Sequence, residues 1–341
     1  MVALRKTAPG AGHLELQEVP RPVPADGEVL IQVAATGICG SDLKILNWNT
    51  QVTMAPPVTI GHEFSGTVVE AAADGWKPGD RVTAEPTYRV CGRCLHCQSG
   101  FYNLCAERKV LGFAADGAFA EFVRVPAARV HTLPANVGFH AGALTEPLAC
   151  CVHGLYELTG VGVEELAVVT GPGAIGLLCV QLLKAAGARV VVVGTAADRG
   201  RLELARRLGA EHVVDSSAQD PAAAVAALSG GLGADLVVEC SGAGAAAELG
   251  LELARKRGKY TQLGMFGRPI TLDFERIAYK EIRVVGSFAQ RWSAWKLALR
   301  LLAEDKVKLE PLVSDVLPLH DWQKGFEKFK SRQGLKVLLT P

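Results

Sequence analysis

The feature that most constrains the fold is a glycine-rich turn between an apolar run and a helical segment. Residues 168–176 read Val-Val-Thr-Gly-Pro-Gly-Ala-Ile-Gly, and a helix-like pattern follows from Leu177 to Ala186. In Gly-x-Gly-x-x-Gly, the first glycine makes a tight turn, the second lets backbone approach a pyrophosphate, and the third lets helix pack on strand. The phosphates then lie at a helix N-terminus, where unpaired N–H groups and the helix dipole favour anions.

The surroundings of this turn decide between a dinucleotide site and an ordinary turn, a choice that the glycines alone leave open. The turn follows a strand pattern, opens a helix pattern and precedes a second apolar run, Arg189–Val193. Such a strand–turn–helix–strand unit is typical of dinucleotide binding. The predicted cofactor contacts in the loop are Gly171, Pro172, Gly173, Ala174, Ile175 and Gly176.

The pattern of the chain changes near Phe139. Before it, short apolar runs alternate with Gly-Asp, Pro-Gly and Asp-Gly turns, which predicts a β-rich barrel or sandwich. The runs are Glu28–Val33, Gly66–Glu70, Asp80–Ala84 and Phe119–Val125. After it, a helical segment from Ala141 to Leu158 leads into alternating strands and helices, which predicts an α/β domain with a parallel, doubly wound sheet.

The elements of this second domain and of the tail set the expected domain boundaries. The strands are Leu166–Thr170, Arg189–Val193, His212–Asp215, Leu236–Cys240, Lys259–Leu263 and Ile282–Val285, and the helices are Leu177–Ala186, Arg201–Leu208, Ala222–Leu228 and Ala245–Ala254. The tail has helix patterns at Trp292–Glu304 and Asp321–Lys330 and a strand at Leu335–Leu339. Because the tail has too few elements for a domain of its own, we expect it to return to the first domain. The predicted segments are 1–150, 151–288 and 289–341.

Composition and charge limit which binding partners and which cellular compartment we expect for this protein. The 341 residues carry a formal net charge of +1 and no long run of one sign, so neither nucleic acid nor an anionic membrane is an expected partner. The N-terminus lacks an apolar signal region, and no stretch of about 18 uncharged apolar residues is present. We therefore expect a cytoplasmic protein. In that compartment the nine cysteines favour metal binding over disulfides.

Four of these cysteines, Cys91, Cys94, Cys97 and Cys105, lie in one short segment. Four thiolates at such spacing, in a loop that also contains glycines, are typical of a closed tetrahedral zinc site. An iron–sulfur cluster is the main alternative, but the bacterial ferredoxin run has a shorter last gap that is followed by proline. A site closed by four thiolates has no open position, so the predicted zinc is structural and stabilises a lobe at 91–105.

A second group of metal-ligand residues is dispersed along the first 150 residues. Cys39 lies in a glycine-flanked turn after a strand, His62 and Glu63 precede another strand, and Glu146 follows an apolar segment. Singly, each is explained as a packed side chain or, for Glu146, as a carboxylate near a helix start. Together they supply the soft and borderline ligands of an open, catalytic zinc site.

Taken in order, these motifs resemble those of one known family. The chain resembles the zinc-containing medium-chain dehydrogenases, nearest the sorbitol and threonine dehydrogenases, through Cys39-Gly40-Ser41-Asp42, Gly61-His62-Glu63, the four-cysteine lobe, Glu146-Pro147 and the glycine loop. The resemblance spans essentially the whole chain. It implies an N-terminal GroES-like catalytic domain, a central Rossmann domain, and reversible hydride transfer between an alcohol and a nicotinamide.

The resemblance also implies roles for individual residues. Cys39, His62 and, by position, Glu146 would hold the catalytic zinc, and Glu63 would be the carboxylate that either binds zinc or lies just behind it. Ser41 resembles the hydroxyl that begins the family's proton relay, and a turn hydroxyl bonded to its own backbone is the alternative. Such a zinc acts as a Lewis acid on the substrate oxygen, and the nicotinamide accepts the hydride.

Several positions depart from the family's pattern. Lys44 stands where many relatives have the outer histidine of the relay, so the relay ends either in this lysine or in cofactor ribose and water. Ile45 replaces a tyrosine of sorbitol dehydrogenases, and Ala289-Gln290 replaces their Arg-Tyr pair, which predicts a less polar pocket. The candidate pocket walls are Trp48, Phe113 and Phe288, and Arg291 is a candidate reader of a hydroxyl, carboxylate or phosphate.

The choice between NAD and NADP depends on the end of the second strand. An acidic residue there usually bonds the ribose 2′-hydroxyl of NAD, whereas this chain has Thr195 at the aligned position. Because Arg199 and Arg201 could receive a 2′-phosphate, the pattern favours NADP, and a ribose contact from Asp198 is the alternative. Other candidate cofactor contacts are Ser241, Gly242, Leu263, Gly264, Ser287 and Phe288 at later strand ends, and Lys336 as a phosphate contact.

The sequence therefore predicts a zinc-dependent NAD(P) dehydrogenase that acts on a secondary alcohol, polyol or sugar. A sugar-phosphate or hydroxy-amino-acid dehydrogenase is the alternative substrate class. A non-catalytic zinc- and cofactor-binding scaffold and a zinc-independent quinone or enoyl reductase are alternatives of other classes, and the intact zinc ligands argue against both. A homodimer or homotetramer is expected, with the apolar strand Ile282–Val285 as the pairing edge.

Overall fold

The computed structural model describes all residues from Met1 to Pro341, and they form two compact units. The first unit combines Met1–Ala149 with Gln290–Pro341, and the second comprises Cys150–Ala289. The chain therefore leaves the first unit once and returns to it at its C-terminal end. None of its helices is both long and apolar enough to span a bilayer.

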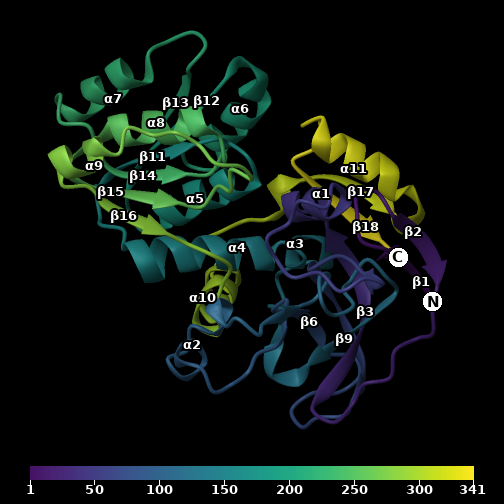
Figure 1. Cartoon of the computed structure of the whole chain (residues 1–341). Coiled ribbons are helices and arrows are strands. Elements are labelled where there is room, and N and C mark those ends of the chain that lie inside the picture. The colour runs from purple at the N-terminus through teal and green to yellow at the C-terminus, as the bar shows by residue number, and fades with distance from the viewer. The chain divides into compact units, whose positions relative to one another are not determined.

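Two sheets build most of the first unit (Figure 1). The larger contains β3 (Glu28–Gly37), β5 (Glu63–Ala71), β6 (Arg81–Ala84), β9 (Phe122–Pro126), β10 (Val130–Thr132), β17 (Val313–Pro318) and β18 (Lys336–Thr340). Its strand order is β10-β6-β5-β3-β18-β17, and β9 also pairs with β3. The smaller sheet has the order β2-β1-β4, with β1 at Val2–Lys6, β2 at Leu14–Glu18 and β4 at Val58–Thr59. A separate ribbon pairs β7 (Thr87–Arg89) with β8 (Lys109–Val110).

The C-terminal return belongs to the core of this unit rather than to its surface. β18 pairs antiparallel with β3, so that Leu338 faces Gly37. The helices of the unit are α1 (Gly40–Leu46), α2 (Leu95–Gln98), α3 (Phe139–Gly142), α4 (Thr145–Val152), α10 (Trp292–Ala303) and α11 (Trp322–Lys330). Phe326 of α11 packs edge-on against Phe119 with 6.3 Å between ring centroids. Burial of such aromatic side chains is the main force that holds the returning segment in place.

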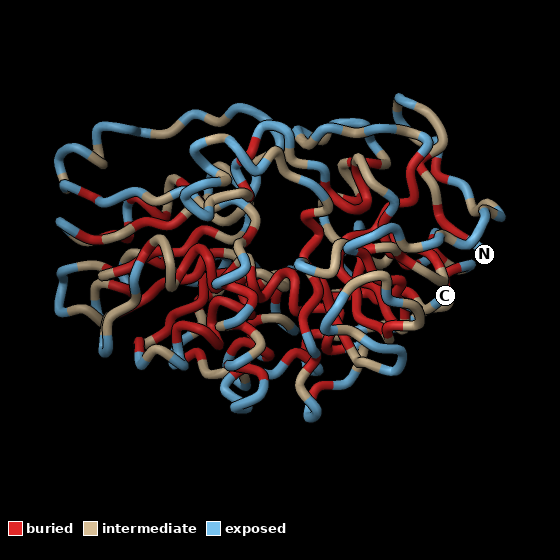
Figure 2. Tube along the Cα trace, turned by 90° about the horizontal axis from the view of Figure 1, so that it is seen from below, coloured by how far each residue is buried: buried red, intermediate tan, exposed pale blue.

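The second unit is a six-stranded parallel sheet with the order β13-β12-β11-β14-β15-β16. Its strands are β11 (Leu166–Thr170), β12 (Arg189–Gly194), β13 (His212–Asp215), β14 (Ala234–Glu239), β15 (Ala254–Gln262) and β16 (Arg283–Gly286), and its helices are α5 (Ala174–Ala185), α6 (Arg199–Arg207), α7 (Pro221–Ser229), α8 (Gly244–Leu253) and α9 (Glu275–Lys280). The central strands are continuous buried runs, because helices cover a parallel sheet on both faces. Figure 2 shows buried residues running through the interior and exposed ones along the outer loops.

Two differences from the sequence analysis concern local structure. Seven short strands of the first unit were not predicted, because runs of two to six residues carry a weak signal: β1, β2, β4, β7, β8, β10 and β17. The expected helix Ala141–Leu158 is instead α3, α4 and a π-helical segment, η3 (His153–Thr159). In η3, Gly154 lies so close to Leu263 that a Cβ would approach the Leu263 side chain to 2.6 Å. This tertiary contact is invisible in the local pattern.

Candidate metal centres and dinucleotide site

Cys39, His62 and Glu63 bring their ligand atoms into one group. Cys39 is the N-cap residue of α1, whereas Glu63 begins β5 and His62 precedes it. Antiparallel pairing of β3 with β5 aligns Gly37 with Glu63, so the residues beyond each strand end meet. The thiol sulfur, the imidazole nitrogen and the carboxylate oxygen lie within 4.8 Å of one another. A soft, a borderline and a hard ligand at this spacing fit a zinc ion with an open position.

Asp42, which the sequence analysis did not single out as a site residue, orients this group. Its Oδ2 accepts a hydrogen bond from the Cys39 N–H at 2.8 Å. Its Oδ1 lies 3.7 Å from Nδ1 of His62, and neither of these two buried atoms has a hydrogen-bond partner. A carboxylate behind one ring nitrogen is the usual second partner of a metal-binding histidine, because it leaves the other nitrogen for the metal. The sequence feature that could have identified Asp42 as a site residue was its position in the first turn of α1.

Burial and charge shift the pKa of both partners. Burial raises the pKa of the Asp42 carboxyl to about 6, although the charge of His62 opposes this shift. Burial lowers the pKa of His62, but Asp42 and the Cys39 thiolate outweigh it and raise the pKa to about 10. On the other side of the ring, Nε2 of His62 lies 3.2 Å from the Ser41 hydroxyl. The Ser41 hydroxyl therefore lies on the side of the imidazole that a metal would occupy.

The two candidate carboxylate ligands have different partners. Glu63 Oε2 forms an ion pair with the ammonium of Lys336, and both side chains are buried. Burial lowers the pKa of Lys336, but the charges of Glu63 and Cys39 outweigh burial and raise it. Lys336 therefore lies behind the metal-ligand group, and not at a cofactor phosphate as the sequence analysis suggested.

Glu146 is held by a neutral partner. It stands in the first turn of α4 and accepts a hydrogen bond from Nε2 of Gln290 at 2.9 Å, with both side chains buried. The charge of Glu146 acts on His62 and on Lys336, which places it beside the ligand group. It is not among the atoms that converge within 4.8 Å. Ile45, the other departure from the family's pocket pattern, is fully buried.

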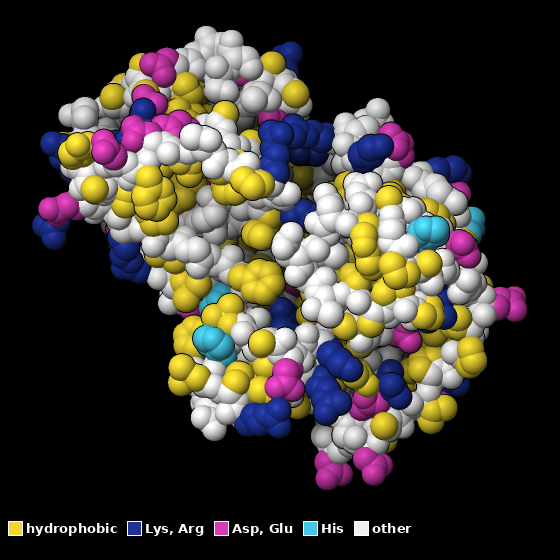
Figure 3. All heavy atoms as spheres, viewed as in Figure 1, with side chains coloured by type: hydrophobic (Ala, Val, Ile, Leu, Met, Phe, Trp, Pro, Cys, Tyr) yellow, Lys and Arg dark blue, Asp and Glu magenta, His cyan; other side chains and the backbone are white.

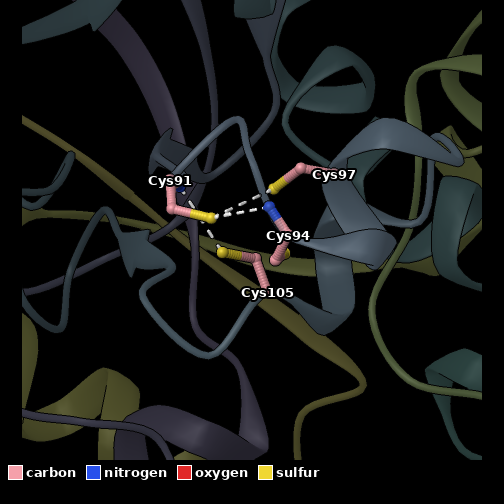
Figure 4. A group of neighbouring side chains, drawn as sticks. All are labelled: Cys91, Cys94, Cys97 and Cys105. Carbon is pink, nitrogen blue, oxygen red and sulfur yellow. Dashed lines mark hydrogen bonds between the residues drawn. The ribbon is translucent and has the colours of Figure 1, made fainter.

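The four cysteines of the lobe converge on one point (Figure 4). Their sulfurs lie within 4.8 Å of one another, and those of Cys91 and Cys97 are 3.9 Å apart. A tetrahedral zinc with Zn–S bonds of about 2.3 Å would separate its sulfurs by about 3.8 Å. The backbone N–H of Cys94 points at the Cys91 sulfur at 3.4 Å, and such N–H groups lower the pKa of Cys91 to about 6. Burial and the neighbouring thiols instead raise the pKa of Cys97 to about 12, so a bound cation would be needed to favour the thiolate form of all four cysteines.

The glycine loop has the shape that a pyrophosphate requires. Gly171 follows β11 with φ of +92°, and a Cβ there would lie 2.6 Å from the Cβ of Ser241. A Cβ at Gly176 would overlap the carbonyl oxygen of Gly171. Gly173 differs, because it caps α5 and no atom lies within 4 Å of the position its Cβ would take. Two glycines therefore allow tight packing, and the third leaves open space at the helix N-terminus for a phosphate.

The other expected cofactor residues also lie at carboxyl ends of the parallel strands. Thr195 follows β12, and its N–H and hydroxyl donate to Oδ2 of Asp198 at 3.1 and 2.9 Å. Asp198 is thus engaged within its own turn, whereas Arg199 is exposed. The remaining contacts follow β14, β15 and β16 in pairs: Ser241 and Gly242, Leu263 and Gly264, and Ser287 and Phe288. In an open α/β sheet, ligands bind outside these ends.

Two candidate pocket walls, Trp48 and Phe113, lie with Arg291 in the first unit, whereas Phe288 is exposed in the second. The ring of Phe113 lies 5.5 Å from that of His62. Trp48 is partly exposed, and the ammonium of Lys6 lies 5.1 Å from its ring centroid. The guanidinium of Arg291 lies 4.1 Å from the ring of Phe101, a residue of the cysteine lobe. The side chain of Arg291 is therefore held against the lobe.

Known proteins match the chain over its whole length. Residues 25–135 match the alcohol dehydrogenase GroES-like domain and residues 174–304 the zinc-binding dehydrogenase family. A sorbitol dehydrogenase of Halalkalibacterium halodurans is 45% identical over 100% of this chain and 99% of its own. D-arabitol-phosphate dehydrogenase of Enterococcus avium is 38% identical over 99% and 97%. The crystal structure of a zinc-binding dehydrogenase of Sinorhizobium meliloti 1021 bound to NADP is 34% identical, with a TM-score of 0.90 over 100% and 99% of the chains.

These matches confirm the fold class and the resemblance predicted from the motifs. The β-rich unit is the GroES-like part, and the parallel sheet is the dinucleotide-binding part of a dehydrogenase. The chain therefore belongs to the zinc-containing medium-chain dehydrogenases, in the branch of the sorbitol and threonine dehydrogenases.

Proposed function

We propose that this enzyme transfers a hydride from the secondary alcohol of a polyol or sugar to NAD(P), giving the ketone. The observation that carries the proposal is the convergence of Cys39, His62 and Glu63 with Asp42 directed at the imidazole. Catalytic zinc sites use three protein ligands and keep one position open, whereas the four-cysteine lobe is closed. When bound, the zinc polarises the substrate oxygen and the nicotinamide accepts the hydride.

Three side chains are proposed to hold the catalytic zinc. Cys39 supplies the thiolate, His62 supplies Nε2, and Glu146 is the third ligand. Glu63 is the alternative carboxylate, and its ion pair with Lys336 favours a place just behind the metal. Cys91, Cys94, Cys97 and Cys105 would hold the structural zinc.

Ser41 is assigned to the first step of proton removal. Its hydroxyl lies 3.2 Å from His62 Nε2, on the metal side of the ring. A hydroxyl at that place can accept the alcohol proton while it donates its own. Lys44 stands near the end of α1, and the proton would leave through the cofactor ribose and water.

The substrate class that the site supports best is an unphosphorylated polyol or sugar. Gln290 has a buried amide oxygen that no hydrogen bond uses, and an amide oxygen accepts from a substrate hydroxyl. Arg291, the candidate reader of a phosphate, stacks on Phe101 instead. A sugar phosphate is the second candidate, because a relative with 38% identity is an arabitol-phosphate dehydrogenase.

The cofactor that this chain favours is NADP. The Asp198 side chain is buried and its Oδ2 accepts from the N–H and hydroxyl of Thr195, so the carboxylate faces its own turn rather than a ribose hydroxyl or a 2′-phosphate. Arg199 is exposed at the first position of α6. Catalytic efficiencies with NAD and NADP decide this point, and a clear preference for NAD would contradict it.

A homo-oligomer built through the second unit is the proposed assembly. β16 is an edge strand of the parallel sheet, and Val284 on it is exposed. Phe274 and Tyr279 of the neighbouring segment are exposed as well. Figure 3 shows hydrophobic side chains gathered on the side of this unit that carries α9, β15 and β16. Open strand edges and apolar patches tend to associate, and light scattering measures the resulting mass.

The decisive experiment is a substrate plate with zinc quantified. Polyols, sugars, sugar phosphates, simple alcohols and hydroxy amino acids are each tested with NAD and NADP. The Cys39→Ala variant should lose turnover and one zinc per chain while keeping the lobe zinc, and Cys150→Ala, outside both cysteine groups, is the matched control. Turnover retained by Cys39→Ala would overturn the catalytic zinc assignment, and no turnover by wild type on any substrate would favour a scaffold.

A further inference from the structure

A buried carboxylate lies at the edge of the parallel sheet where the dinucleotide is proposed to bind. Glu239 is the last residue of β14, and its side chain is completely buried. Its hydrogen-bond partners are neutral groups at the strand ends: the N–H and hydroxyl of Ser241 and the N–H of Gly242, which follow β14, and the amide of Gln262, the last residue of β15. A buried carboxylate without a cation is costly, so its retention here calls for an explanation.

Backbone and side-chain donors surround this carboxylate. The Ser241 N–H donates at 2.8 Å and the Gly242 N–H at 3.1 Å to Oε1. The Ser241 hydroxyl accepts from the Ala243 N–H at 3.0 Å, so its own hydrogen is directed at Glu239.

Gln262 completes the set of donors in a fixed orientation. Its Oε1 accepts from the Tyr260 hydroxyl at 2.7 Å, which leaves the NH2 group for Oε2 of Glu239 at 2.7 Å. The same NH2 group donates to the Gly264 carbonyl at 2.6 Å. Every partner of Glu239 is thus a donor, which is the arrangement that stabilises a negative charge without a counter-ion.

The carboxylate connects three loops at this edge. The backbone carbonyl of Glu239 accepts from the N–H groups of Leu263 and Gly264 at 2.9 and 2.8 Å. A Cβ at Gly264 would overlap Oε2 of Glu239, so this backbone lies directly on the charge. Ser241 in turn packs against Gly171 of the glycine loop. The charge is therefore held below the loops to which the dinucleotide contacts have been assigned.

We propose that the buried charge of Glu239 makes the site bind the oxidised cofactor more tightly than the reduced one. The oxidised nicotinamide ring carries a positive charge and the reduced ring carries none. A fixed anion at a poorly solvated edge attracts the oxidised ring and has no net charge to attract on the reduced ring. The inference rests on the proposed function, because it requires that the nicotinamide end of the cofactor reaches this edge. Its consequence is that bound reduced cofactor is a better hydride donor to the ketone.

The test compares dissociation constants for oxidised cofactor, reduced cofactor and ADP-ribose, which lacks the nicotinamide. Each is measured on the zinc-loaded full-length enzyme by calorimetry, without substrate. In Glu239→Gln we expect oxidised cofactor to bind about 5–10-fold more weakly, which is about 1.0–1.4 kcal/mol. Reduced cofactor and ADP-ribose should change less than about twofold. An equal loss for the oxidised and reduced forms would overturn the proposal, since a purely structural brace acts on both.

Two further variants make the outcome independent of one substitution. Gln262→Lys places an ammonium against the carboxylate and should produce the same selective loss, which matters if Glu239→Gln does not fold. Tyr260→Phe removes one hydrogen bond of the network but no charge, so it should leave the ratio of the two dissociation constants unchanged. A shifted ratio in Tyr260→Phe, or an unshifted one in Gln262→Lys, would contradict the proposal.

The result also separates this inference from the proposed function. If wild type binds ADP-ribose and both cofactor forms but the ratio does not respond to Glu239, only this inference fails. If wild type binds none of the three ligands, the assignment of the dinucleotide site is wrong, and both the proposed function and this inference are contradicted. Melting temperatures of all variants confirm that folded protein is compared.

Discussion

The side-chain amide of Gln290 donates a hydrogen bond to the carboxylate of Glu146 across 2.9 Å in the interior of the first unit. Gln290 is the first residue after the chain returns to that unit, whereas Glu146 lies near the end of the unit's N-terminal part. The hydrogen bond fixes the orientation of the Glu146 carboxylate. The returning segment therefore contributes directly to the proposed active site.

Removing this amide should impair the reaction with the alcohol. We expect Gln290→Leu to lower kcat/KM for the substrate about 10–100-fold, because a buried carboxylate loses a charged hydrogen bond of about 1.5–3 kcal/mol. Steady-state kinetics measure the effect. Gln323→Leu on the exposed face of α11 is the matched control and should remain within about twofold of wild type. Unchanged kinetics in Gln290→Leu would show that Glu146 does not need this partner.

Asp42 should control zinc affinity rather than cofactor binding. Its carboxylate faces Nδ1 of His62 at 3.7 Å, so Asp42→Asn should weaken zinc binding at the catalytic site about 10–100-fold. Titration with a competing chelator, read as zinc per chain, measures the loss, and the lobe zinc should remain. Asp26→Asn, at an exposed position, is the control. Wild-type zinc affinity in Asp42→Asn would disprove the orienting role.

The lobe zinc should be separable from the catalytic one. Cys97→Ser removes one of four converging thiols, and we expect zinc content to fall by one ion per chain. The melting temperature should fall by about 2–4 °C for each 1 kcal/mol of lost stability. Cofactor affinity should not change, because the glycine loop belongs to the other unit. A Cys97→Ser variant that retains both zinc ions would contradict the assignment of the four thiols.

Gly173 and Gly138 offer a matched pair for the phosphate site. Both cap a helix with extended backbone, and neither has an atom within 4 Å of the position a Cβ would take. Alanine at either site should therefore leave the melting temperature within about 1 °C of wild type. We expect only Gly173→Ala to raise the cofactor KM, by about tenfold, since its methyl group would occupy the space left for pyrophosphate. Equal cofactor KM values for the two variants would show that the cofactor pyrophosphate does not bind at this loop.

An ion pair in the returning segment should make stability depend on acid pH. The hydrogen bond from Lys328 of α11 lowers the pKa of Asp315 in β17, although burial opposes it. A carboxyl with a lowered pKa in the folded state contributes stability above its unfolded pKa of about 3.9 and loses it as pH falls through the folded value. Lys328 is partly exposed, so we expect Asp315→Asn to cost less than about 1 kcal/mol at pH 7. Urea unfolding should show this difference shrinking below about pH 4, and a constant difference would exclude the ion pair as its cause.

The sequence by itself determined the features that depend on local spacing. The glycine loop, the strand Leu166–Thr170 and the convergence of Cys91, Cys94, Cys97 and Cys105 are observed where the sequence placed them. A turn with glycines at set offsets and thiols a few residues apart have few alternative arrangements, because the connecting chain is short. The matched family also follows from these motifs taken in order.

Tertiary structure alone decided the partners that surround these motifs. Gln290 meets Glu146 across 144 positions and Lys336 meets Glu63 across 273, and no local pattern indicates either pair. Asp42 acquired its place behind His62 only through the pairing of β3 with β5. The hydrogen-bond donors to Glu239 come from two strand ends of the parallel sheet. Each buried charge needs a specific partner to offset its desolvation, and only the folded chain brings residues so far apart in sequence to hydrogen-bonding distance.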